Sequence, residues 1–106
     1  MKKQILRLAL QDITLDQRLQ PRVTIHEDRV SEYAERLEAG DTFPPVTVFY
    51  DGSVYWLTDG FHRFYAARQR QETGIAAEIH DGSFHDAIEH SVSANATHGM
   101  PRSRAD

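Results

Sequence analysis

One stretch near the middle of the chain constrains the fold most: Leu57-Thr58-Asp59-Gly60-Phe61-His62-Arg63-Phe64. An alternating apolar pattern typical of a strand precedes it, and apolar residues at helical spacing follow it. Asp59-Gly60 separates the two patterns and is a dipeptide that favours turns. The sequence therefore predicts a strand that ends in a tight turn and leads directly into a helix.

Two further elements are predicted before this stretch. Apolar residues alternate from Leu6 to Leu15, which indicates one half-buried strand. Thr24 and Glu27 have the spacing of a capping box, and the apolar residues after them recur at helical spacing until Gly40. We expect an amphipathic helix that Thr24 caps and Gly40 ends.

Apolar patterns and turn signals predict the remaining elements. They are a hairpin with strands at 46–50 and 54–57 around Asp51-Gly52, a helix running from Phe61 to Gly74, a strand at 75–79, and a helix that Ser83 and Asp86 cap and Gly99 ends. The order β-α-β-β-α-β-α predicts an α+β domain with a small mixed sheet and three to four helices.

Composition narrows the class of protein. With 106 residues, one domain is expected, and 12 Lys and Arg against 16 Asp and Glu give a net charge of −4. A chain without a basic cluster is a poor stand-alone DNA binder. The absence of cysteine excludes disulfides and thiolate zinc sites. The charged start, Met1-Lys2-Lys3, is unlike a signal peptide, and no apolar stretch is long enough for a membrane span, so we expect a cytoplasmic location and no membrane partner.

The predicted helix start offers chemistry for binding an anion. The first N–H groups of a helix lack carbonyl partners, and Gly60 would let a phosphate approach them closely. Arg63 would add a fork of donors matched to phosphate oxygens, and His62 another donor or a proton carrier. Taken by itself, the spacing is a weak signal for a ligand site and favours a purely structural alternative: Asp59 as N-cap, His62 on a solvated face and Arg63 in a surface ion pair.

Five motifs together resemble the ParB/sulfiredoxin-like superfamily, and most closely the ParB N-terminal ("ParB-like nuclease") domains of bacterial, plasmid and phage regulators. In chain order they are Gln20-Pro21-Arg22, a helix ending near Gly40, Pro44-Pro45-Val46, Leu57-Thr58-Asp59-Gly60-Phe61-His62-Arg63 and Asn95-Ala96-Thr97-His98-Gly99. The resemblance covers about residues 5–106. It implies the ParB/sulfiredoxin-like fold.

The resemblance also implies a binding site. The superfamily segment that matches Gly60 to Arg63 reads Gly-Glu-Arg-Arg in partition ParB, Gly-Cys-His-Arg in sulfiredoxin and Gly-His-His-Arg in a free-serine kinase branch, and it holds nucleotide phosphates. The expected nucleotide- or phosphate-binding residues are Gly60, Phe61, His62, Arg63, Arg22, Asn95 and His98. His98 has an equal alternative as a cation at a helix C-terminus. The implied cofactor is a nucleoside triphosphate, CTP or ATP, with Mg²⁺.

Two departures from the superfamily pattern limit the chemistry. Phe61 replaces the sulfiredoxin cysteine, which excludes repair of sulfinic acids. Ala94 stands where partition ParB has a metal-binding glutamate, which argues against CTP hydrolysis. His85 and Glu89 could share a metal at i and i+4 but have no third ligand nearby. No catalytic residue and no metal ligand set is assigned.

The expected function is that of a ParB-like domain in a DNA-binding regulator or partition-type protein. Residues 1–106 would form one domain, the N-terminal fragment of a longer protein with a helix-turn-helix part that makes most of the DNA contact. The sequence leaves open whether the domain forms a homodimer. One alternative is an enzyme of phosphate chemistry, a nuclease or a nucleotide-dependent phosphotransferase, for which Asp59, Glu27 and Asp86 are the candidate carboxylates. The other is an adaptor with a degenerate pocket. We favour a binding domain over an efficient enzyme.

Overall fold

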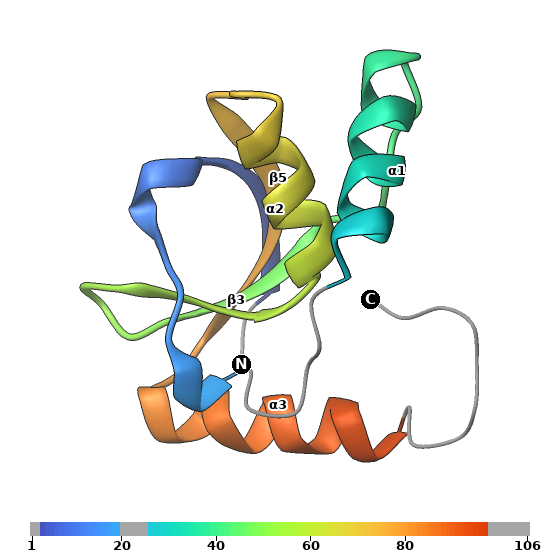
Figure 1. The fold of residues 1–106 in the computed structure, drawn as a ribbon. Helices are drawn as coiled ribbons and strands as arrows, with labels where there is room; N and C mark the ends of the chain where they lie inside the picture. Colours follow the sequence, from blue (N-terminus) through green and yellow to red (C-terminus); the bar gives the residue numbers. More distant parts are fainter. Residues whose placement is uncertain (1–2, 20–25, 98–106) are drawn as a thin grey trace.

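A computed structural model describes residues 3–19 and 26–97 (Figure 1). In chain order the elements are β1 (Lys3–Ala9), the 3₁₀ turn η1 (Leu10–Asp12), β2 (Ile13–Thr14), the 3₁₀ turn η2 (Gln17–Leu19), α1 (Glu27–Glu38), β3 (Val46–Tyr50), β4 (Tyr55–Asp59), α2 (Phe61–Gln69), β5 (Gly74–Asp81) and α3 (Phe84–Thr97). The expected α+β class is confirmed. Within the described residues, no helix has the length and apolar content that a membrane crossing requires.

The sheet is mixed, as predicted, with the strand order β1-β5-β3-β4-β2. β1 pairs with β5 and β3 with β4 in antiparallel fashion, whereas β3 pairs with β5 and β2 with β4 in parallel fashion. β3 and β5 are parallel neighbours, and the chain segment between them, which contains β4 and α2, forms their crossover connection. This connection positions the start of α2 at the end of the β3–β4 hairpin.

The first strand differs from the prediction. The alternating pattern from Leu6 to Leu15 is divided by η1 into β1 and β2, which lie at opposite edges of the sheet. A flat sheet of this order would hold these edges about 19 Å apart, at about 4.8 Å per strand. The four peptide steps from Ala9 to Ile13 span at most about 14 Å. The sheet must therefore curl, and Figure 1 shows the blue N-terminal segment closing it.

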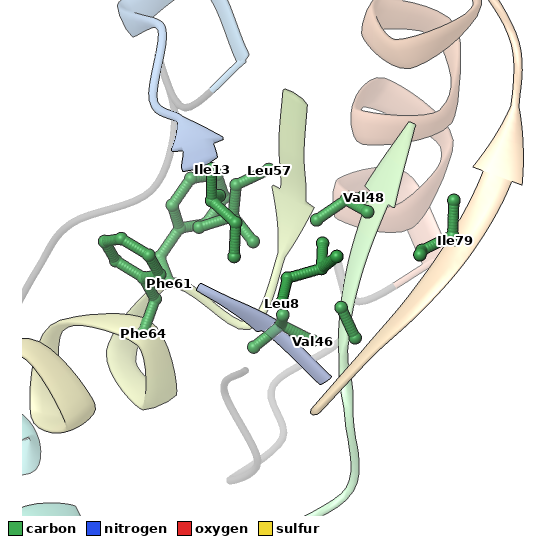
Figure 2. Close-up of a cluster of buried hydrophobic side chains, with 9 residues drawn as sticks. Leu8, Ile13, Val46, Val48, Leu57, Phe61, Phe64 and Ile79 are labelled. Atoms are coloured by element: carbon green, nitrogen blue, oxygen red, sulfur yellow. The ribbon is translucent and has the colours of Figure 1, made fainter. Parts of the chain in front are cut away.

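Two helices cover the two faces of the curled sheet. Phe61 and Phe64 of α2 fill its inner side, as Figure 2 shows. The other members of this core are Leu8, Ile13, Val46, Val48, Leu57, Ala77 and Ile79. α3 covers the opposite face, where Phe49 and Ala87 are buried together with Leu19. Trp56 and Tyr65 pack half-buried against these clusters.

The helix boundaries partly match the predictions. The capping box of α3 is confirmed, because the Ser83 N–H donates to Asp86 Oδ2 at 2.9 Å and the Asp86 N–H to Ser83 Oγ at 3.1 Å. The capping box of Thr24 and Glu27 is wrong: α1 begins at Glu27 with His26 as N-cap, and Thr24 lies outside the described residues.

Two turns also differ in detail. α2 ends at Gln69 and does not run on to Gly74, because Gln71 adopts a φ of 61° and the Glu72 N–H turns back to the Ala67 carbonyl at 3.0 Å. The hairpin turn is centred one residue later than predicted, since the Asp51 N–H donates to the Val54 carbonyl at 3.3 Å.

Candidate functional site

The start of α2 is formed by a glycine in a left-handed conformation. Gly60 is the N-cap, with φ 91° and ψ 33°, and no side chain caps the helix. Asp59 is the last residue of β4, where its pairing with Thr47 keeps it extended. The structural alternative with Asp59 as N-cap is therefore wrong.

Gly60 also lies against the neighbouring strand. A Cβ atom built on it would come within 2.8 Å of Val46 Cγ1. The first intrahelical bond runs from the Phe64 N–H to the Gly60 carbonyl at 2.9 Å, so the preceding N–H groups are those that have no carbonyl partner within a helix. Gly60 has no side chain that could accept from these N–H groups, so any acceptor at this positive end of the helix dipole must come from elsewhere.

Arg63 folds back over the start of its own helix. Its Nη1 donates to the Pro44 carbonyl at 2.6 Å and to the Pro45 carbonyl at 3.2 Å. Its Nη2 lies 3.0 Å from the position that a Cβ on Gly60 would occupy. The Pro44 and Pro45 carbonyls thus hold the guanidinium next to Gly60.

The His62 side chain is buried, with 3% of the residue exposed. Its Nε2 accepts a hydrogen bond from the His26 N–H at 3.2 Å, and the two rings lie 6.0 Å apart and nearly parallel. An accepting Nε2 belongs to the neutral ring that carries its proton on Nδ1. The alternative with His62 on a solvated face is wrong. The histidine joins the starts of α1 and α2, a contact across 36 positions that no local pattern indicates.

The other predicted site residues have separate outcomes. Phe61 is 3% exposed and its side chain belongs to the core, so only its backbone N–H could contact a ligand. Asn95 lies in the last turn of α3. Arg22 and His98 lie outside the described residues.

Arg63 also lines a surface pocket of about 370 Å³. The pocket lies between the end of α1, the loop that leads into β3, and the β1–β5 edge, and Arg7 and Phe43 are among its lining residues. Arg63 therefore reaches from the start of α2 to a concave surface next to it.

No group of three or more histidine, aspartate or glutamate side chains with metal-binding geometry occurs within residues 3–19 and 26–97. His85 and Glu89 form the expected i, i+4 pair at 3.1 Å between Nε2 and Oε2, with both side chains exposed. This pair is a solvated contact on the outer face of α3. Within these residues there is therefore no ready-made carboxylate cage for a cation such as Mg²⁺.

Comparison with known families identifies the chain. The family model described as the ParB N-terminal domain matches residues 1–96. The chain belongs to the ParB N-terminal domain family. The resemblance in the motifs is thus confirmed, and Gly60 to Arg63 lies inside the matched region. No curated protein matches the chain.

Solved structures confirm the ParB/sulfiredoxin-like fold. A sulfiredoxin from Arabidopsis thaliana is 20% identical with a TM-score of 0.69, over 84% of this chain and 97% of that one. The truncated partition protein ParB from Caulobacter crescentus, complexed with CTP-γ-S, is 16% identical with a TM-score of 0.73, over 97% of this chain and 55% of that one. A pNOB8-like ParB N-domain is 13% identical with a TM-score of 0.76, over 99% and 40%. This chain spans about half or less of these ParB chains.

Proposed function

We propose that this ParB N-terminal domain binds the phosphates of a nucleoside triphosphate at the start of α2, as the nucleotide-binding module of a DNA-binding regulator or partition-type protein. One observation carries the proposal: the guanidinium of Arg63 is held above a left-handed Gly60 N-cap. Backbone N–H groups, the helix dipole and a planar cation all favour an anion there. Gly60, the Phe61 N–H, His62 and Arg63 form the core of the proposed site, and Arg22, Asn95 and His98 complete it.

The ParB relatives support the choice of nucleotide and partner. Caulobacter crescentus ParB has been solved with CTP-γ-S, and a second structure of it, complexed to the centromeric parS site, is 14% identical to this chain. CTP is therefore the first nucleotide to test, with ATP second. The net charge of −4 leads us to place DNA reading in a part of the protein outside residues 1–106.

Calorimetric titration with CTP, ATP and GTP, with and without Mg²⁺, tests the proposal. We expect one nucleotide to bind the chain and Arg63→Ala to abolish binding, because the fork of donors above Gly60 is lost. Arg68→Ala is the matched control, since Arg68 lies on the same helix but stacks on Tyr65 at 4.7 Å, away from the helix start. Equal weakening by both variants, or no binding of any of the three nucleotides, would contradict the proposal.

Asp59 distinguishes a binding module from an enzyme. Of the three candidate carboxylates, Asp86 caps α3 and Glu27 lies in the first turn of α1, whereas Asp59 directly precedes Gly60. We expect the wild-type chain to show no metal-dependent cleavage. We expect Asp59→Asn to retain nucleotide binding. Cleavage of a nucleoside triphosphate or nucleic acid that falls by about 10²-fold in Asp59→Asn would favour an enzyme.

A further inference from the structure

A second polar cluster lies between α3 and the sheet. His80 of β5 and His90 of α3 pack on the ring of Phe49, at 5.1 Å and 5.2 Å between centroids, and lie 5.7 Å from each other. β3 supplies Phe49 on this face, while its neighbours Val46 and Val48 point into the inner core. Two histidines from different elements thus share one aromatic contact beneath the helix.

Each of these histidines has a buried ring nitrogen without a hydrogen bond. They are His80 Nε2 and His90 Nδ1. His80 Nε2 lies 3.8 Å from Glu78 Oε1, which is close for an ion pair but too long for a hydrogen bond. A neutral ring tolerates this environment, whereas a protonated His90 would bury a charge whose Nδ1 has no hydrogen-bond partner.

The charges around His90 act in both directions. Burial lowers the pKa of His90, and so does His80, whereas the carboxylates of Asp59 and Glu78 act to raise it. Burial and His80 prevail, so the folded state disfavours the protonated ring. From the remaining element packed on α3, η2, the charged group is Arg18, and it stacks at 4.3 Å on Phe84, the first residue of the helix.

We propose that His90, which packs against His80 and Phe49, is a proton-sensitive latch that holds α3 on the sheet while its ring is neutral and loosens it when the ring is protonated. A proton on His90 would place a cation 5.7 Å from the His80 ring and against Phe49. Release of α3 lets this cation reach water.

The sign of the pH dependence follows from which state binds more protons. Above the ordinary histidine pKa of about 6.5, neither state is protonated and the latch is closed. As the pH falls below that value, the released state takes up a proton on His90 that the closed state resists. Acidification therefore favours release, by up to about tenfold per pH unit for each extra proton bound.

The structure contains its own reporter for release. Trp56 is the single tryptophan of the chain, and its ring packs on Phe84 of α3 at 4.7 Å between centroids. α3 is also tied to η2 by the Ser91 hydroxyl, which donates to the Leu19 carbonyl at 2.7 Å. Because α3 carries Asn95 in its last turn, release would also reach the proposed nucleotide site, a consequence that rests on the proposed function.

The experiment uses the 106-residue chain without nucleotide, so its outcome is independent of the nucleotide proposal. Between about pH 7.5 and about pH 5.5 we expect a red shift of Trp56 emission. Over the same range, after correction for intrinsic exchange rates, the protection of α3 amides should fall by up to about tenfold while that of α1 and α2 is retained. A uniform loss of protection in all three helices, or none, would overturn the latch.

Three variants isolate the histidines. His90→Gln should remove the transition, because no cation can form at that position. His80→Gln should only weaken it, because burial still disfavours the charge on His90. His85→Gln is the matched control on the same helix, since the His85 side chain is 78% exposed and should leave the transition unchanged. If a glutamine variant is unfolded at neutral pH, the ring ¹⁵N shifts of wild-type His80 and His90 decide. Rings that titrate without any change in α3 protection would contradict the proposal.

Discussion

Position 60 requires a glycine for two separate reasons, its backbone conformation and the lack of space for a side chain. Its φ of 91° is a conformation that other residues adopt at a cost, and Val46 leaves no room for a Cβ. Gly52 has a similar φ of 103° but open space around it. A comparison of the two glycines therefore separates the cost of the left-handed backbone, which both share, from the steric overlap, which only Gly60 has.

We expect Gly60→Ala to lower the free energy of unfolding by about 2–4 kcal/mol, from the left-handed backbone and the overlap with Val46 together. Gly52→Ala should cost only the backbone part, about 1–2 kcal/mol. Urea unfolding of both variants measures the difference. Equal losses would show that Val46 moves away without penalty.

At the scale of single elements, capping decides where helices begin. α3 starts with a reciprocal pair of side-chain bonds between Ser83 and Asp86, whereas α2 starts at a glycine without a side-chain cap. The helix without a capping side chain is the one that we propose binds an anion, and the anion would then take the place that the cap occupies in α3.

Removal of the α3 cap should lower stability modestly. Ser83→Ala deletes the acceptor of the Asp86 N–H, and we expect a loss of about 0.5–2 kcal/mol in thermal or urea unfolding. Ser53→Ala, in the exposed hairpin turn, is the control and should stay within about 0.5 kcal/mol of wild type. A Ser83 variant as stable as this control would show that the cap contributes nothing to α3.

At the scale of the whole molecule, closure of the sheet unites residues that are local in sequence but distant in the strand order. Leu8 of β1 and Ile13 of β2 come from opposite edges and meet in one core with Phe64 of α2 (Figure 2). The short η1 turn enforces this closure. The start of α2 is positioned by the same core, because Phe61 and Phe64 anchor it there.

Two leucines of one strand test the closed core. Leu8 is 9% exposed and Leu6 is 45% exposed. Leu8→Ala should cost about 2–5 kcal/mol, because it opens a cavity that the curled sheet cannot collapse. Leu6→Ala has the same change in strand propensity and should cost clearly less. Similar losses in urea unfolding would indicate that β1 does not contribute to a closed core.

The sequence by itself determined the local features of this protein. Apolar periodicity predicted β3, β4, β5 and the three helices, and Ser83 with Asp86 predicted the start of α3, because these signals act over a few residues. The motif from Leu57 to Arg63 predicted the strand-turn-helix at the candidate site, and the resemblance that it carries predicted the family.

Only the tertiary structure decided which residues meet. The alternation from Leu6 to Leu15 predicts one strand, whereas closure of the sheet divides this segment into β1 and β2. Burial of His62 against His26, the Pro44 and Pro45 carbonyls beneath Arg63, and the meeting of His80 with His90 are contacts between separate elements. Periodicity reports the face on which a side chain lies. The partner on the other side is set by the sheet order and its curl, which no local pattern contains.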